Sequence, residues 1–500
     1  MSPLLVFSVI TVYFGILILI SYITSKNADT TTFFTGNKQS PWYLVAFGMI
    51  GASLSGVTFI SVPGAVVNEG MAYFQVVLGY VLGYLVIAKV LMPIYYKLNL
   101  ISIYEYLNSR FGIVSYKTGA SFFILSRTLG SSLRLFLATI VLQLFLFEDL
   151  GFPYWLTAVA TILLIWVYTF KGGIKTIVYT DTFQTFFLIS AVVICTIIIA
   201  QSLDVSFFGL IRKVNEANNG SFSFGKIFFM DDYKSTLYFP KQFFGGMFIA
   251  IAMTGLDQDL MQKNLTCKNI KEAQRNMYSF TAIMVVVTFL FLLLGGALYV
   301  YAQSKNIALP MGVDGKIITD KVFPTLAFSE FGTIAGIFFL LGIIASSYAS
   351  ADSALAALST GFCIDFLNFN NKKEQVRKKL KNFVHIGFSA LFLIIILIVN
   401  EVQTASLIST ILKVASYTYG PLLGLFGFGI ITKYKVIDKY VPVIAVISPI
   451  LCYILNIYSV EWFNGYEFGF ELLIVNGLIT FLGLYILALV NGRKRLEKLI

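Results

Sequence analysis

Residues 340–358 read LLGIIASSYASADSALAAL, an apolar stretch interrupted near its middle by polar side chains. The run is long enough for a membrane helix, and Ser346, Ser347, Ser350, Asp352 and Ser353 would lie near the middle of the bilayer. A carboxylate at that depth costs roughly 2.5 to 3.5 kcal/mol on insertion scales, so it should face a partner, a cavity or a bound cation rather than lipid. The stretch therefore predicts a helix that lines a transport pathway.

The composition of the whole chain predicts an all-α polytopic membrane protein. Hydrophobic residues make up 58% of the 500 residues, charged residues make up 12%, and the mean hydropathy is +0.83. A soluble domain of this length does not show such values. Thirteen apolar runs have about the 20 residues that cross a bilayer. They cover residues 4–23, 42–63, 74–98, 117–147, 153–170, 176–202, 240–261, 277–302, 331–364, 382–400, 405–432, 440–458 and 468–491.

The distribution of basic residues predicts how the chain is oriented. If the N-terminus lies outside, inside segments hold 24 of the 36 Lys and Arg residues and outside loops hold 8. Cytoplasmic loops carry such an excess, so we expect the N-terminus outside and the C-terminus in the cytoplasm of a cell (inner) membrane. The net charge of +11 then reflects topology and contact with the lipid bilayer, and it does not indicate nucleic-acid binding.

Two predicted helices are interrupted by glycine in similar ways. One spans residues 41–64 and the other spans residues 241–262. Each opens a set of five segments, 42–202 and 240–432, and the second set starts on the opposite side of the membrane. This arrangement is typical of an inverted five-plus-five (LeuT-like) repeat with two broken helices. One extra helix at 4–23 would precede the repeats, two at 440–491 would follow them, and all would form a single transport domain.

The polar residues of the opening stretch favour a hard cation. Ser346, Ser350 and Ser353 share one helical face, with Asp352 at its edge. Oxygen ligands alone suit sodium, and the sequence has no His/Cys cluster for a transition metal. Serines in membrane helices also bond to the preceding turn, so close packing is an alternative reading of the hydroxyls.

Seven stretches in this order resemble the solute:sodium symporter family, which includes sodium-coupled glucose, proline, iodide, vitamin and sialic acid carriers. They are TTFFTGNKQSPWYL, FISVPGAVVNEG, MPIYYKLNLISIYEYLNSRFG, KGGIKTIVYTDTFQ, GLDQDLMQKNL with EAQ, SSYASADSALAALSTGFCID and YTYGPLLGLF. The resemblance implies a secondary active transporter that imports a small organic solute with sodium by alternating access. It does not imply an enzyme.

The resemblance implies a first sodium site between the first broken helix and the stretch 340–358. Its ligands would be backbone carbonyls at Gly51, Leu54 and Ser346, with hydroxyls at positions 349 and 350. This chain has Ala349 and Ser350 there, so one usual hydroxyl is missing.

Some relatives in this family hold a second cation. The acid of their TD-x-x-Q motif corresponds to Asp181, and their hydroxyl positions correspond to Asp352 and Ser353 here. A carboxylate in place of a hydroxyl would strengthen cation binding or force two close acids to share a proton. The second cation could therefore be sodium or a proton, and the number of sodium ions, one or two, stays open.

The solute is less well defined by the resemblance. Positions that contact sugar in the sugar carriers are here largely apolar, which disfavours glucose: Thr58, Val77, Tyr80 and Ala250. Lys413 and Arg134 offer cations for an anionic solute such as sialic acid, a monocarboxylate or a vitamin. In the alternative, Lys413 pairs with Asp352 and the solute is a neutral sugar or amino acid. Phe59, Phe74 and Tyr417 are further candidates for the pocket wall.

Other charged residues near the membrane have simpler interpretations. We expect Arg127 and Lys89 to extend to the interface or to pair with helix ends. We expect Asp257 and Asp259 to form interfacial pairs beside Lys263. A channel or sensor on the same fold is a further alternative, but the sequence has no repeated filter-like motif. The solute's identity and the oligomeric state are not predicted.

Overall fold

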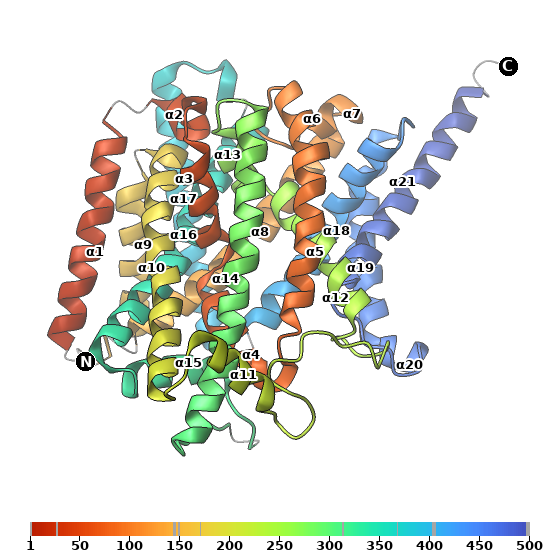
Figure 1. The fold of residues 1–500 in the computed structure, drawn as a ribbon. Coiled ribbons are helices and arrows are strands. Elements are labelled where there is room, and N and C mark those ends of the chain that lie inside the picture. The colour runs from red at the N-terminus through yellow and green to blue at the C-terminus, as the bar shows by residue number, and fades with distance from the viewer. Residues whose placement is uncertain are drawn as a thin grey trace.

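The computed structural model describes residues 3–26, 29–143, 147–148, 151–170, 172–312, 315–367, 369–402 and 407–496. Within these ranges the elements are helices, with two isolated β-bridges and no strand. Figure 1 shows them as a bundle in which the start of α1 and the end of α21 lie at opposite ends. The first half comprises α1 (Pro3–Thr24), α2 (Thr30–Thr35), α3 (Trp42–Ser53), α4 (Gly56–Glu69), α5 (Tyr73–Val86), α6 (Met92–Lys97), α7 (Glu105–Arg110), α8 (Ile113–Leu142), α9 (Tyr154–Thr169), α10 (Gly173–Ser202) and α11 (Phe207–Glu216). The second half comprises α12 (Phe239–Ala250), α13 (Gln258–Leu265), α14 (Ile270–Ser304), α15 (Thr319–Ser329), α16 (Gly332–Leu367), α17 (Glu374–Val402), α18 (Leu407–Ile431), α19 (Val441–Ile457), α20 (Ser459–Trp462) and α21 (Leu472–Leu496).

The apolar helices agree with the predicted membrane segments. Among the described residues, ten helices are long and apolar enough to cross a membrane, and the bent pair α3 and α4 would make an eleventh span. The other two predicted segments coincide with α9, which has 16 residues, and with the region of α12 and α13. The count of thirteen spans therefore stays a prediction, as does the division into repeats at 42–202 and 240–432.

The first predicted break is present between α3 and α4, whose axes differ by 62°. Leu54 leaves the helical region with ψ 75°, and Ser55 is extended with φ −63° and ψ 168°. A Cβ on Gly56 would lie 2.0 Å from Ser347 Oγ on α16. A side chain there would require the Ser347 hydroxyl to move, so the glycine allows the start of α4 to pack closely against the stretch 340–358.

The second predicted break follows α12. The chain forms a π-helical segment over Ile251–Gly255 and then becomes extended at Asp257, with φ −110° and ψ 125°. The Asp257 side chain accepts a hydrogen bond from the amide of Asp259 at 2.8 Å and so caps α13. In Figure 1 the path from α3 to α4 runs downward and the path from α12 to α13 runs upward, as an inverted pair would.

Burial separates the inner helices from the lipid-facing ones. The middle of α16 is buried throughout, including Ser346, Ser347, Ser350, Asp352 and Ser353. Large exposed apolar side chains gather on α1, α17, α19 and α21. Such side chains suit contact with hydrocarbon, so these four helices form the lipid-facing periphery and α16 forms part of the core.

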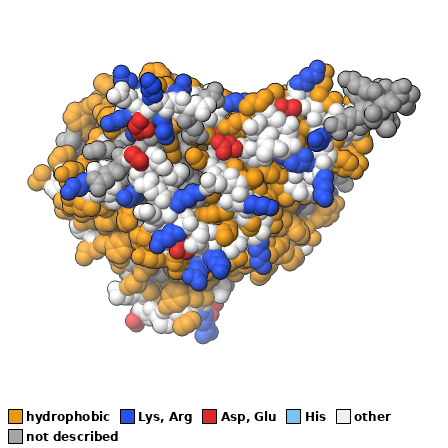
Figure 2. All heavy atoms as spheres, turned by 90° about the horizontal axis from the view of Figure 1, so that it is seen from above, with side chains coloured by type: hydrophobic (Ala, Val, Ile, Leu, Met, Phe, Trp, Pro, Cys, Tyr) orange, Lys and Arg blue, Asp and Glu red, His pale blue; other side chains and the backbone are white. Residues whose placement is uncertain are grey.

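The two ends of the bundle differ in their surface elements. The connecting segments 203–239 and 303–330 contain the short helices α11 and α15. Both helices lie at the lower end in Figure 1, near the start of α1. Figure 2 shows the opposite end, where Lys and Arg side chains are spread over the face.

Candidate functional site

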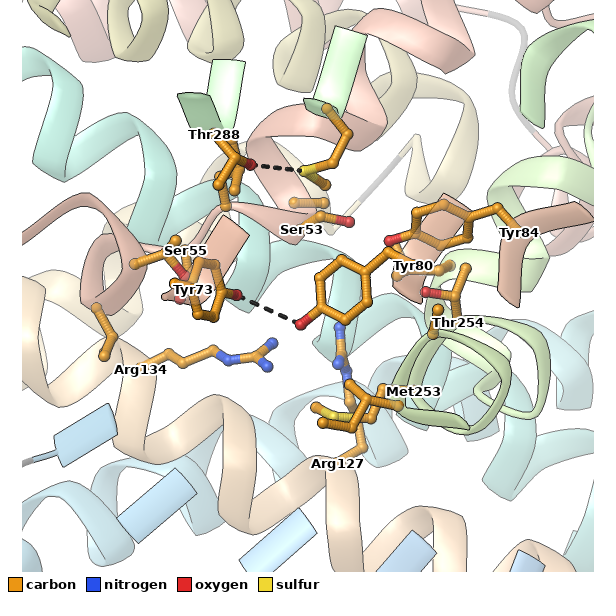
Figure 3. Close-up of a pocket in the computed structure, with 18 residues that line it drawn as sticks. Ser53, Ser55, Tyr73, Tyr80, Tyr84, Arg127, Arg134, Met253, Thr254 and Thr288 are labelled. Carbon is orange, nitrogen blue, oxygen red and sulfur yellow. Dashed lines mark hydrogen bonds between the residues drawn. The ribbon is translucent and has the colours of Figure 1, made fainter. Parts of the chain in front are cut away.

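A buried cavity of about 100 Å³ lies at the first break. The chain on both sides of the break lines it, together with α5, α8, the second broken helix and α14. Figure 3 shows its polar side chains converging on one space. The lining includes Ser53, Leu54, Ser55, Thr58, Tyr73, Tyr80, Tyr84, Arg127, Arg134, Ala250, Met253, Thr254, Met284 and Thr288. Both broken helices thus contribute to one cavity, which is where the fold exposes free backbone groups.

Arg127 of α8 is neutralised by acids at the second break. Its guanidinium pairs with Asp259 and lies 3.7 Å from Asp257, which also accepts a hydrogen bond from Tyr419 of α18. Arg127 is 3% exposed, and both acids are fully buried. The expectation that Arg127 extends to the interface is wrong, and so is the expectation that the two acids pair at the interface beside Lys263. The π-helical segment and the break bring both acids inward to face α8.

Arg134 lies two turns further along α8 and has different surroundings. In the described part of the chain no carboxylate pairs with it. Its Nη1 donates a hydrogen bond to Ser350 Oγ at 3.4 Å, and its guanidinium points toward the hydroxyls of Tyr73 and Tyr80 in Figure 3. The cavity therefore contains a guanidinium whose charge the described residues do not neutralise by direct contact.

Tyr73 separates this cavity from a second one. Its hydroxyl lies 3.3 Å from that of Tyr80, and the two close the cavity on one side. Tyr73 also lines an adjoining cavity of about 230 Å³, together with Glu69, Asn456 and Phe470. Tyr73 therefore lies between the two cavities and contributes to the wall of each.

The residues predicted for the first cation site are all buried. Gly51 and Leu54 lie at the end of α3 and the break, which packs against α16 where Gly56 meets Ser347. The end of a helix leaves carbonyls without amide partners, so this end of α3 can supply ligands. Ser350 Oγ faces Arg134. The other members on α16 are Ser346, whose hydroxyl bonds to the carbonyl of Ile343 at 3.1 Å, and Ala349, which is fully buried.

The residues predicted for the second cation site are brought together, with one addition. Ser353 Oγ lies 3.4 Å from Asp181 Oδ2, and Asp352 accepts hydrogen bonds from Tyr168 at 2.9 Å and from the Ser353 amide at 2.5 Å. The ammonium of Lys263 lies 2.5 Å from the same Oδ2 of Asp181. No local pattern predicts this contact, because Lys263 follows a break, in a polar stretch whose composition is that of a loop.

The predicted solute contacts divide into two groups. Thr58 and Arg134 line the cavity, as do Tyr80 and Ala250, whereas Val77 is buried outside its lining. Phe59, Phe74 and Tyr417 are not among the residues that line this cavity, and their place in the solute pocket stays a prediction.

Each of these three side chains has other neighbours. Phe59 is fully buried and packs on Phe291, Phe323 and Phe339, because one helical position beyond Thr58 turns it by about 100°. Phe74 packs against Phe289, and Tyr417 accepts a hydrogen bond from Asn456. Lys413 belongs to α18, but its side chain lies outside the described part of the structure.

Comparisons with known proteins match this chain along most of its length. The model of the sodium:solute symporter family matches residues 33–435. The chain is 25% identical to the sodium/sialic acid symporter SiaT of Proteus mirabilis over 463 residues, which covers 88% of each protein. It is 24% identical to the sodium-coupled monocarboxylate transporter 2 of Mus musculus, and the match covers 81% of this chain and 64% of that transporter.

Two solved structures share the fold. A substrate-bound, outward-open sodium-coupled sialic acid symporter superposes with a TM-score of 0.82 at 21% identity, covering 97% of this chain and 98% of the other. The nucleobase-cation-symport-1 family transporter Mhp1, in a closed conformation, superposes with a TM-score of 0.58 at 13% identity, covering 90% and 92%. The predicted fold class is therefore confirmed.

Proposed function

We propose that this chain, which belongs to the sodium:solute symporter family, imports a small organic anion with sodium. The observation that carries the proposal is the Arg134 guanidinium, which lines the cavity without a carboxylate partner among the described residues. An unpaired guanidinium in a membrane protein interior needs an anion, and its planar donors fit a carboxylate.

The proposed orientation has the N-terminus outside and the C-terminus in the cytoplasm of the cell membrane. The excess of basic residues on one set of loops supports it, and so do the many Lys and Arg side chains on the face seen in Figure 2. In this orientation α11 and α15 cover the outer end of the pathway. Tyr73 then lies between the outer cavity and the cavity at the first break.

The proposed sodium site joins the end of α3 to α16. The carbonyls of Gly51 and Leu54 lie at the negative end of a short helix, which favours a cation. Ser346 and Ser350 would supply the remaining oxygens from α16, and Ala349 supplies no side-chain oxygen. Sodium would tie the broken helix to α16 and so hold the solute cavity in shape.

Arg134 offers a physical reason for coupling. Sodium is about the size of calcium, whose ligands lie about 2.4 Å away, so sodium on Ser350 Oγ would sit within about 6 Å of Arg134 Nη1. Two unit charges about 6 Å apart repel by about 3 kcal/mol at an effective dielectric constant of about 20. An anion held by Arg134 cancels this repulsion, so sodium and anion each bind better when the other is present.

The cavity favours a compact monocarboxylate among the anions considered. Its volume of about 100 Å³ is smaller than the roughly 150 Å³ of an engineered cavity that holds benzene. Its wall carries the hydroxyls of serine, threonine and tyrosine side chains beside the apolar groups of Ala250 and Met253, so the small volume, and not a lack of polar partners, disfavours a sugar acid. Entry of the solute requires Tyr73 to move, after which closure and rocking of the helices would expose the site to the inside.

A thermal-shift screen with matched pairs of ligands tests the proposal. The purified protein is heated with small carboxylic acids and with their uncharged amides, once in sodium and once in choline. The proposal expects stabilisation by an acid, in sodium, with no effect of the matched amide. Stabilisation by neutral sugars or amino acids alone would contradict it and favour the pairing of Lys413 with Asp352. Equal shifts in choline would contradict sodium coupling.

A further inference from the structure

We propose that Lys263 is a tethered cation that occupies the place of a second sodium, so that the chain binds one sodium. The inference rests on the proposed function in taking the first site as the place where that one sodium binds, and its consequence for the transported charge also takes the solute as the proposed anion. It concerns the second group of residues, which some relatives use for a cation and which this chain fills from its own sequence.

The contact between Lys263 and Asp181 is buried on all sides. The ammonium lies 2.5 Å from Asp181 Oδ2, and the side chains are 1% and 0% exposed. Ser353 Oγ approaches the same carboxylate oxygen at 3.4 Å. An ammonium and a sodium ion carry the same charge, so Asp181 with Lys263 has the charge balance that Asp181 with sodium would have.

The oxygens around the ammonium would suit a sodium ion if the ammonium were absent. Asp181 Oδ1 makes no hydrogen bond among the described residues. Together with Asp181 Oδ2 and Ser353 Oγ, it forms a set of hard oxygen donors that Lys263 supplies with charge. Leaving a buried carboxylate oxygen unpaired is costly, so this oxygen could take a cation ligand.

Asp352 adds a second carboxyl to the group. Its oxygens accept hydrogen bonds from Tyr168 and from the Ser353 amide, while the close contact of Lys263 is with Asp181. The ammonium of Lys263 therefore pairs with Asp181, whereas Asp352 is held by its own hydrogen bonds.

A lysine in this position changes the energetics of transport. A second sodium must leave in each cycle, whereas Lys263 stays bonded to the chain. With one sodium and one monovalent anion the transported charges cancel. Each further sodium would add about 2.3 kcal/mol per 100 mV of membrane potential to the driving force. We therefore expect a transporter driven by the sodium gradient and insensitive to voltage.

Counting bound sodium tests the inference without knowledge of the solute. Saturation binding of ²²Na⁺ to the purified full chain should give one ion in the wild type and two in Lys263→Met. Lys263→Arg, which keeps the charge, should bind one ion. Lys263→Met combined with Asp181→Asn, which removes both charges, should also bind one. Asp352→Asn should bind one, because Lys263 still pairs with Asp181 in this variant.

Other ion counts for the wild type and for Lys263→Met would overturn the inference or the proposed first site. Two ions in the wild type, or one ion in Lys263→Met, would overturn the inference. Lys263→Met should have a lower melting temperature than the wild type in choline, and sodium should restore that temperature. Failure of this variant to fold even in high sodium would also overturn the inference, because the site would then not accept the ion. If the wild type bound no sodium, the first site of the proposed function would be refuted. This outcome differs from the two-ion wild type and the one-ion Lys263→Met variant that would overturn the inference.

Discussion

Replacing Arg134 by Gln should strengthen sodium binding in the absence of solute. The guanidinium lies 3.4 Å from Ser350 Oγ, and a sodium ion on that oxygen would be within about 6 Å of it. The repulsion of about 3 kcal/mol corresponds to roughly a 100-fold change in affinity. Arg134→Gln should therefore lower the dissociation constant for sodium by about 100-fold, because the substitution removes the positive charge that repels the ion.

The same substitution should remove the coupling between sodium and solute. In the wild type, a saturating acid should tighten sodium binding by up to about 100-fold, and sodium should tighten acid binding equally, because the effect is reciprocal. In Arg134→Gln both factors should fall to nearly one. The acid itself should bind about 10- to 100-fold more weakly, since hydrogen bonds between charged groups contribute about 1.5 to 3 kcal/mol.

Two titrations measure these quantities. Sodium is titrated into purified wild type, Arg134→Gln and Arg134→Lys, with and without the acid that the thermal-shift screen selects, and binding is followed by ²²Na⁺ retention. Arg134→Lys is the matched control, because it keeps the positive charge near Ser350. Unchanged sodium affinity in Arg134→Gln, or coupling that survives it, would refute the view that this guanidinium links the two sites.

Three further substitutions test the packing on which the site depends. Gly246→Ala should lower the free energy of unfolding by about 1 to 3 kcal/mol, because its Cβ would lie 2.2 Å from a backbone carbonyl of α5. Its control is Gly387→Ala, whose Cβ meets no atom within 4 Å and which should be neutral or stabilising. The melting temperatures of the two variants in detergent test the difference. Arg127→Met should cost about 3 to 5 kcal/mol by leaving buried acids unpaired, and changing both acid partners to amides should restore the melting temperature; no recovery would contradict the pairing. Phe59→Ala should cost about 3 to 5 kcal/mol of stability with no change in solute affinity of the folded protein, so a specific loss of affinity would place this side chain in the cavity after all.

The fold could be predicted because its determinants are local in the sequence. Each membrane helix needs an apolar run of fixed length, so the positions of the spans follow from hydropathy. The two breaks coincide with glycines that allow close approach, as at Gly56, whose Cβ would strike Ser347. The buried hydroxyls and carboxyl of α16 were also identifiable, because polar groups at mid-membrane depth are rare without a role.

The ionic partners could not be predicted, because they depend on contacts between distant segments. Lys263 and Asp181 are 82 residues apart, and Lys263 lies in the stretch QDLMQKNL, which has the composition of a loop. Its burial follows from the second break, which carries α13 into the protein. Phe59 shows the same dependence on distant segments: it directly follows Thr58, but on a helix the two side chains face different neighbours.

Uptake into proteoliposomes tests the central claim most directly. The protein is reconstituted, loaded in choline and given an inward sodium gradient, and entry of the radiolabelled acid selected by the thermal-shift screen is followed over time. The account predicts accumulation above the outside concentration, which collapses when a sodium ionophore dissipates the gradient and is absent with Arg134→Gln. Entry at the same rate with choline on both sides, or entry that stops at equal concentrations, would contradict sodium-coupled transport of an anion.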